Sequence, residues 1–255
     1  MKGGMNQAYW DDIAVRYDEE ILDAVKNDKN GVIKQSIRGH ADKTHLAADF
    51  GCGIGKTLPL LSRCFSIVDA YDLSGKNLEL ARWKCRRFPN VRYHHRDLST
   101  DDRISGKVDF AISINVLLAP SPETRSGILR TICDGLLPRG ILLLVAPSLE
   151  SALYSDFRLL EWNLREGVDY DDARREGLTA DSKNGGAVAN GIVTLDGVAT
   201  KHYLREELHV TLRSMGLETI ETHKVEYAWS TEFDEVPAWL KGPYPWDWMV
   251  LAQKR

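Results

Sequence analysis

A glycine-rich turn is the part of the sequence best suited to bind a ligand. Residues 49–55 read Asp-Phe-Gly-Cys-Gly-Ile-Gly and follow a short apolar segment. Glycines let the backbone turn tightly and leave main-chain amides open to a ligand. Lys56 stands where a dinucleotide-binding Gly-x-Gly-x-x-Gly motif ends in glycine, and Phe50 stands where a phosphate loop begins with one. The turn therefore predicts a ligand site but does not by itself identify the ligand.

Two further acids follow the next two apolar segments. Asp72 lies about 20 residues after Gly51, the spacing expected of a carboxylate that holds a ribose diol. Asp97 follows the third segment, where it can accept from an exocyclic adenine amine. A single aspartate more often caps a helix. Together with Asp49, however, these acids end three successive strands, which favours a nucleoside-containing ligand at the carboxyl edge of one sheet.

The elements that must position these residues alternate between strands and helices. Apolar segments predict strands at 46–50, 66–73, 91–95, 108–117 and 140–146. Helical periodicity predicts helices at 56–64, 77–88 and 204–216, and another around Ile128, Leu129, Ile132 and Leu136. Segments 217–229 and 246–254 predict late strands with no crossover helix between them. The expected class is α/β: a Rossmann-like, doubly wound, mostly parallel sheet with an antiparallel C-terminal edge strand and helices on both faces.

Two segments lie outside this alternation. Residues 1–40 predict an N-terminal helical cap, and residues 149–203 separate the fifth strand from the last helix. Within the second segment, Asp196-Gly197 between alternating runs predicts a hairpin. An insertion of this length in a compact domain is typical of a lid or substrate element. We therefore expect one domain over residues 1–255 that carries both additions.

Composition excludes several classes of protein. The 255 residues carry a formal net charge of −4 with 43% hydrophobic residues, as in ordinary globular proteins rather than disordered chains. Four cysteines without a Cys-x-x-Cys pair predict neither a metal site nor a disulfide framework. No apolar stretch has the length of a membrane span, and the first residues lack a signal-peptide core. These features predict a cytoplasmic protein without a membrane partner.

The motifs together resemble those of class I S-adenosylmethionine-dependent methyltransferases, small-molecule branch. LAADFGCGIG is similar to the first motif of that family and VDAYDLSGKNLELAR to its second-strand segment. VDFAISINVLLAP resembles the fourth-strand motif. Leu137-Pro138-Arg139-Gly140 resembles the Leu-x-Pro-Gly-Gly turn before the fifth strand, with a mild departure. The resemblance covers residues 9–148 well and the C-terminal elements loosely.

The resemblance implies S-adenosyl-L-methionine as the cofactor and assigns residues to it. Asp49 and the loop Gly51, Cys52 and Gly53 would surround its methionine part, Asp72 would bind the ribose, Leu73 would pack on the adenine, Asp97 and Leu98 would flank the base, and Ser113 and Asn115 would lie near the methionine amine. The opening helix would supply Tyr9 and Tyr17 to close over the cofactor, although core packing explains both tyrosines equally well.

The acceptor side is less defined. Leu118-Ala119-Pro120 follows the fourth strand, where many small-molecule members carry a histidine, so His202 is the candidate base by position. A lone histidine is more often structural. An aromatic wall over the methyl group would comprise Trp10, Trp162, Tyr203, Tyr227 and Trp229. It suits an aromatic or cationic acceptor, and packing of the insert explains these residues equally well.

The sequence therefore predicts methyl transfer to an oxygen or nitrogen atom of a small molecule by a monomer or homodimer. A basic run between Arg82 and Arg96 would suit RNA, which ranks second among substrates because acids elsewhere offset it. Nucleic acid is therefore not expected as a partner. A protein substrate also fits the motifs, as does a catalytically silent cofactor-binding protein that acts through a partner. A nicotinamide dehydrogenase ranks third because the last glycine of its motif is missing.

Overall fold

The computed structural model describes residues 5–100, 104, 106–176, 185–195 and 197–255. A seven-stranded sheet has the strand order β3-β2-β1-β4-β5-β9-β8, and β6 and β7 form a separate hairpin. The strands are β1 Asp42–Phe50, β2 Phe65–Asp72, β3 Val91–His95, β4 Val108–Ile114, β5 Leu136–Pro147, β6 Ile192–Leu195, β7 Val198–Lys201, β8 Leu217–Glu226 and β9 Trp246–Lys254. The α-helices are α1 Gln7–Ile13, α2 Tyr17–Glu20, α3 Ala24–Asn27, α4 Val32–Gly39, α5 Leu58–Cys64, α6 Gly75–Lys84, α7 Pro122–Gly135, α8 Leu149–Arg165, α9 Tyr170–Ala173, α10 Gly185–Ala189 and α11 Arg205–Ser214. Short 3-10 helices are η1 Ala14–Arg16, η2 Arg174–Glu176 and η3 Trp229–Thr231.

The predicted fold class is confirmed. Strands β1 to β5 pair in parallel, whereas β9 runs antiparallel to both of its neighbours, β5 and β8. The antiparallel strand thus lies one position inside the edge, and β8 forms the edge itself. The segment between β8 and β9 contains only η3 and no crossover helix, which is why the two strands pair antiparallel.

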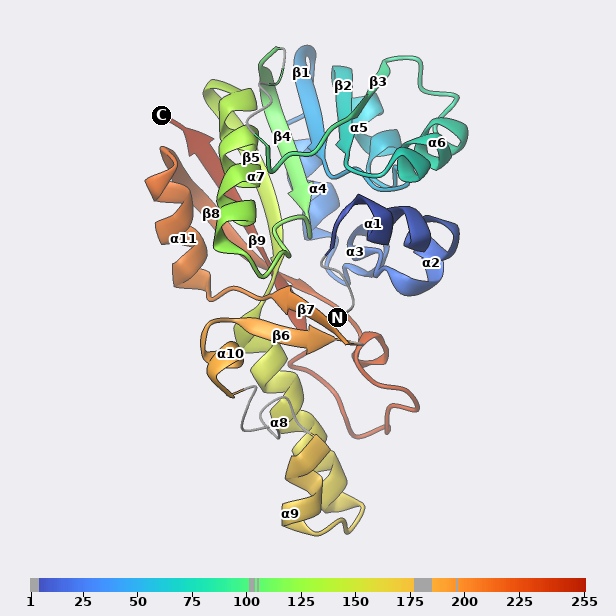
Figure 1. Cartoon of the computed structure of the whole chain (residues 1–255), viewed down its shortest axis with the longest axis vertical. Helices are drawn as coiled ribbons and strands as arrows, with labels where there is room; N and C mark the ends of the chain where they lie inside the picture. The colour runs from blue at the N-terminus through green and yellow to red at the C-terminus, as the bar shows by residue number, and fades with distance from the viewer. Residues whose placement is uncertain (1–4, 101–103, 105, 177–184, 196) are drawn as a thin grey trace.

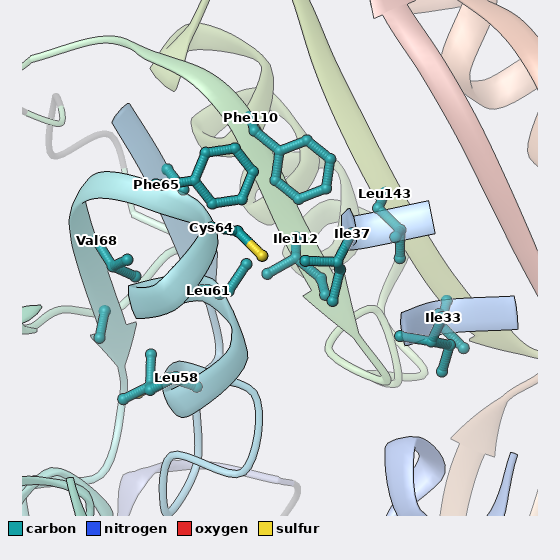
Figure 2. Packing of buried hydrophobic residues seen from close by; sticks show 14 of the residues in the cluster. Ile33, Ile37, Leu58, Leu61, Cys64, Phe65, Val68, Phe110, Ile112 and Leu143 are labelled. Carbon is teal, nitrogen blue, oxygen red and sulfur yellow. The ribbon is translucent and has the colours of Figure 1, made fainter. Parts of the chain in front are cut away.

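Two apolar layers hold helices on opposite faces of the sheet. On one face, Ile33 and Ile37 of α4 and Leu61 of α5 pack on Phe110 of β4 and Leu143 of β5 (Figure 2). On the other face, buried leucines and isoleucines of α7 and α11 pack on the alternate residues of the same strands. Because both faces are covered, the central strands are apolar on both sides, and polar groups concentrate at the strand ends.

The N-terminal helices and the insertion both lie toward the carboxyl ends of the parallel strands (Figure 1). The cap α1–α3 lies below β2 and α6, and α8 extends away from the sheet toward α9. The predicted hairpin forms, with Ile192 paired to Lys201 and Leu195 to Val198. Gly197 has a positive φ of 77°, while its predicted turn partner Asp196 lies outside the described residues.

Several element boundaries differ from the sequence-based expectation. Leu136, expected in a helix, instead begins β5, and α5 begins at Leu58 rather than at residue 56. The helix expected at 77–88 instead begins at Gly75 and ends at Lys84. The hydroxyl of Ser74 caps its start by accepting from the Asn77 amide, and the Phe88 amide donates to Cys85 O in a turn after its end. In the described part of the chain, no helix has both the length and the apolar character needed to cross a membrane.

Candidate functional site

The glycine turn is held against the end of β2 by main-chain hydrogen bonds. The amides of Gly51 and Cys52 both donate to Tyr71 O, at 2.8 and 2.9 Å. Gly51 has a φ of +79°, and a Cβ at this position would lie 2.4 Å from Cγ2 of Val116. The sequence therefore needs glycine here for both conformation and space. The turn is placed where β1, β2 and β4 end together.

Asp72 connects this turn to the next one. One oxygen of its carboxylate accepts from the Gly53 amide at 2.7 Å, and the other accepts from the Ser74 amide at 2.8 Å and from Asn77 Nδ2 at 3.3 Å. The side chain is 7% exposed, and burial raises its pKa, although these hydrogen bonds oppose the shift. The oxygen that faces Gly53 carries a single donor, so it can accept another from a ligand hydroxyl.

Asp49 is the second buried acid at this site. It is 2% exposed, and its carboxylate accepts a hydrogen bond from the Thr57 hydroxyl. Burial raises the pKa of Asp49 to about 7, and the nearby negative charge of Asp72 adds to the shift. Among the described residues, neither Asp49 nor Asp72 forms an ion pair with a basic side chain. Two buried, uncompensated carboxylates favour a cationic ligand beside them.

The N-terminal cap closes over the glycine turn through Tyr17. A Cβ on Gly53 would lie 2.3 Å from the Tyr17 hydroxyl, so this side chain lies directly against the turn. Burial raises the pKa of Tyr17, and the charge of Asp72 adds to the effect. Lys56 and Lys84 hold the same cap by ion pairs to Asp18 at 3.2 and 2.7 Å. The structure thus brings Tyr17 to the predicted cofactor residues.

Sequence reasoning missed a second anchor of the cap. The Ser74 hydroxyl donates to Asp11 Oδ1 at 2.5 Å, which joins α1 to the turn beside Asp72. Tyr9 and Trp10 lie on the same helix, half-buried, with their rings 5.2 Å apart. No sequence motif signals Asp11, because its partner is distant in the chain.

The predicted adenine-side residues lie beyond β2 and β3. Leu73 is half-buried, and its carbonyl oxygen accepts from His95 Nε2 at 2.8 Å. Asp97 is exposed and accepts from the Ser99 amide at 2.8 Å, whereas Leu98 is buried in the core. The arrangement leaves Asp97 accessible for a polar contact with a ligand, and its role stays a prediction.

The end of β4 presents polar atoms that lack partners. The Ser113 hydroxyl and Asn115 Oδ1 are buried and make no hydrogen bond within the described chain. Asn115 adopts a positive φ of 52°, and its Nδ2 donates to Asp247 Oδ2 at 3.1 Å. Buried polar atoms without partners are rare in folded proteins, so these atoms favour a ligand at this edge.

Two of the five predicted acceptor-side aromatics gather around one phenylalanine. The ring of Trp229 stacks on Phe233 at 5.6 Å, and Trp162 of α8 meets Phe233 edge-on at 5.9 Å. Tyr154, also on α8, lies 5.8 Å from Trp229 and 6.1 Å from Trp246. Sequence reasoning missed Phe233, Tyr154 and Trp246, since no periodicity links α8 to the segment before β9.

Three other predicted residues take separate positions. Tyr227 is buried and its hydroxyl donates to Asp247 Oδ2 at 2.8 Å. Tyr203 is also buried, with its hydroxyl donating to Leu117 O at 2.8 Å, so its ring packs in the core. The described contacts of Trp10 likewise do not join it to the aromatic residues around Phe233. The predicted wall is thus assembled only in part.

His202 lies where the hairpin meets the sheet edge. The amides of its neighbours Lys201 and Tyr203 donate to Leu118 O and Pro147 O, which follow β4 and end β5. Its Nδ1 lies 3.2 Å from Thr200 O. Because a carbonyl only accepts, Nδ1 carries the proton and Nε2 carries the lone pair. Burial lowers the pKa of His202, which favours the neutral, basic form at pH 7.

The residues present fit S-adenosyl-L-methionine. Its sulfonium and ammonium charges would compensate the buried carboxylates Asp49 and Asp72, and its polar groups would satisfy Ser113 and Asn115. Asp72 would hold the ribose, and Tyr17 would close the methionine end. These residue assignments follow the resemblance and stay predictions.

Comparison with known proteins agrees with this fit. Residues 47–140 match the family described as "Methyltransferase domain". A search of curated proteins finds no match. Solved structures with a similar fold include a SAM-dependent methyltransferase from Methanosarcina mazei, 20% identical, which covers 86% of this chain and 96% of its own with a TM-score of 0.58. Magnesium protoporphyrin IX methyltransferase from Synechocystis with bound SAH is 15% identical and covers 98% and 97%, with a TM-score of 0.57. The 1,6-didemethyltoxoflavin-N1-methyltransferase of Burkholderia thailandensis is 14% identical and covers 96% and 87%, with a TM-score of 0.61.

Proposed function

We propose that this S-adenosylmethionine-dependent methyltransferase transfers a methyl group to an oxygen or nitrogen atom of a small molecule. The enzyme class and the cofactor agree with the matched methyltransferase domain. The observation that carries the proposal is the pair of buried, uncompensated carboxylates, Asp49 and Asp72, beneath a glycine turn that Tyr17 closes. A cationic nucleoside cofactor is the ligand that this set of groups matches.

The cofactor supplies a methyl group on a positively charged sulfur, which is already an electrophile. A lone pair on the acceptor forms the new bond to the methyl carbon, the carbon–sulfur bond breaks with its electrons left on sulfur, and the acceptor loses a proton. The chain has to align the two reactants and exclude water. Such alignment contributes roughly 7–11 kcal/mol to lowering a barrier. No covalent nucleophile is needed.

His202 is our candidate for the residue that receives this proton. Its Nε2 has no hydrogen-bond partner among the described residues, and its lowered pKa favours the neutral form that accepts a proton at pH 7. The hydrogen bonds of its neighbours to the loop after β4 and to the end of β5 support this role. The insertion 149–203 would act as the substrate lid, because it contributes both His202 and α8.

Local pairing within the basic run supports a small molecule over RNA. Arg92 donates to buried Asp69 at 2.7 and 2.5 Å, and Lys84 pairs with Asp18 at 2.7 Å. Arg82 lies over the ring of Tyr93 at 5.2 Å. Charges engaged in this way are less available to phosphates, so RNA stays the second candidate. A cytoplasmic monomer or homodimer remains our prediction for the cellular form.

Calorimetric titration with S-adenosyl-L-methionine and with its demethylated product, SAH, tests the proposal. We expect both to bind in the micromolar range, and we expect methyl transfer from labelled cofactor to some member of an amine, phenol and carboxylate panel. Binding of neither compound would refute the methyltransferase. Binding without turnover across the panel would instead favour a catalytically silent cofactor-binding protein.

A further inference from the structure

Asp247 is a buried carboxylate that the predicted cofactor set does not use. It lies near the start of β9, opposite Pro147 of β5 and Val225 of β8. Because β9 is antiparallel, its first residues reach the same edge of the sheet as the carboxyl ends of the parallel strands. Asn115, at the end of β4, joins Asp247 to that edge by a hydrogen bond of 3.1 Å.

The two oxygens of Asp247 differ in their partners. Oδ2 accepts from both Asn115 Nδ2 and the Tyr227 hydroxyl, at 3.1 and 2.8 Å. Oδ1 accepts no hydrogen bond from the described residues, although the side chain is only 9% exposed. Burial raises the pKa of Asp247, and these two hydrogen bonds oppose the shift. A carboxylate held in this way has one oxygen ready for a donor.

The surroundings of Asp247 are acidic. The charges of Asp247, Asp28 and Glu232 all raise the pKa of Tyr227 beyond the effect of burial. Desolvation raises the pKa of Glu232, and the charge of Asp247 adds to the shift. Among the described residues, no lysine, arginine or histidine forms an ion pair with Asp247 or Glu232. The negative charges of these carboxylates favour the binding of a cation.

Aromatic residues lie close in the sequence to Tyr227 and Glu232. Trp229 follows Tyr227 by two positions and stacks on Phe233, the residue after Glu232. Arg158 of α8 lies 6.0 Å from the Trp229 ring and shares Glu161 with Arg165, at 3.2 and 2.7 Å. Trp229 is only 2% exposed, so its ring is covered by Phe233 and Tyr154, and the two acids carry the argument for a cationic ligand.

We propose that Asp247, through the Oδ1 that accepts no hydrogen bond from the described residues, binds a protonated amine of the methyl acceptor, with Glu232 as a second acid. The inference rests on the proposed function and narrows its acceptor to organic amines. The bound ammonium group has no lone pair, so it loses the proton assigned above to His202 before its nitrogen attacks the methyl carbon. Asp247 then acts as a substrate-binding residue whose orientation is fixed by Asn115 and Tyr227. A charge-assisted hydrogen bond of this kind discriminates against alcohols and rejects carboxylates.

A matched series of three probes tests this selectivity. 2-Phenylethylamine, 2-phenylethanol and 3-phenylpropanoate share one aromatic group and differ in their polar end. Each is titrated calorimetrically into SAH-saturated and into ligand-free protein. We expect the amine to bind at least about tenfold more tightly than the alcohol, and the carboxylate not to bind. Equal binding of the three, or no saturable binding of the amine, would overturn the proposal.

Two variants locate the effect. Asp247→Asn should weaken amine binding by about tenfold or more while SAH affinity stays within about twofold. Glu232→Gln, which keeps the size and shape of the side chain and removes its charge, should weaken amine binding severalfold. Glu218→Gln, at the far end of β8 and 70% exposed, is the matched control and should change neither. Unchanged amine binding in both site variants would overturn the assignment.

The outcomes separate this inference from the proposed function. Loss of SAH affinity in Asp247→Asn would place Asp247 against the cofactor and overturn the acceptor assignment, while the methyltransferase would stand. Failure of the wild-type protein to bind SAH would refute the proposed function instead. In that case the amine titration of ligand-free protein still decides whether Asp247 recognises amines.

Discussion

Replacement of Asp49 by asparagine gives the most direct test of the site's electrostatics. The pKa of Asp49 rises from an ordinary 3.8 to about 7, because the carboxylate is buried and lies near Asp72. The pKa is thus higher in the folded state than in the unfolded state. The protein is therefore most stable with respect to this group below about pH 4, where the carboxyl is protonated, and it loses that stability as the pH rises to about 7. A shift of about 3 pKa units corresponds to about 4 kcal/mol as an upper bound.

The Asp49→Asn variant should not lose stability between pH 4 and pH 7 in this way. Its amide oxygen can still accept from the Thr57 hydroxyl, but it carries no charge at any pH. Without ligand, we expect Asp49→Asn to become progressively more stable than the wild type between about pH 4 and pH 7, by up to about 4 kcal/mol. Urea denaturation at several pH values measures the difference, with exposed Glu79→Gln as the control. Parallel stability curves for the wild type and Asp49→Asn would refute the reasoning.

The affinity for the cofactor should rise with pH over the range in which the stability of the ligand-free protein falls. A cationic ligand stabilises the ionised form of Asp49, so its binding lowers that pKa and releases a proton below about pH 7. The affinity of the wild type for S-adenosylmethionine should therefore rise with pH up to about 7 and then level off. Asp49→Asn should bind more weakly at pH 8 and lose this dependence. Calorimetry in buffers of different ionisation enthalpy would detect the proton, and no proton release near pH 6 would contradict a cation at Asp49.

Three further outcomes are expected. Gly53→Ala should weaken SAH binding about tenfold or more, because its Cβ would lie 2.3 Å from the Tyr17 hydroxyl at a φ of +51°; Gly39→Ala, with no atom within 4 Å, should leave it unchanged in the same titration. Asp72→Ala should cost about 1.5–3 kcal/mol of cofactor affinity, as loss of a charged hydrogen-bond acceptor does, and unchanged affinity would exclude the ribose contact. His202→Asn should lower kcat and remove its rise with pH while SAH affinity stays constant; an unaltered pH profile would exclude His202 as the base.

The positions of the glycine turn and of the acids beside it could be predicted from the sequence because they depend on short-range patterns. Apolar segments that end in Asp49 and Asp72 place both carboxylates at one sheet edge once the strands are parallel, and the Gly53 amide joins Asp72 to the glycine turn. The predicted strand at 91–95 coincides with β3. Tyr17 was assigned from the family resemblance, and the structure places it against Gly53.

The acceptor side could not be predicted in the same way, because its contacts join segments far apart in the chain. Neither the pairing of Tyr154 with Trp229 nor the bond from Asn115 to Asp247 leaves a periodic signal. One signal was present: Asp247 is the single charged residue in the otherwise apolar start of β9, Trp-Asp-Trp-Met-Val-Leu. A buried charge lowers stability unless it is compensated, so it requires either a partner within the fold or a ligand.

The structure distinguishes these two cases for Asp247. Tyr227 and Asn115 are neutral donors, and they engage one oxygen without supplying the positive charge that a buried carboxylate lacks. Asp69 is the instructive contrast, because Arg92 and His94 contact both of its oxygens and its role is complete within the fold. By the same comparison, neither Asp49 nor Asp247 has a basic partner among the described residues. Their strands lie on opposite sides of β4, which carries Ser113 and leads into Asn115. Two uncompensated acids along one sheet edge favour two separate cationic ligands, the methyl donor at one and an amine acceptor at the other.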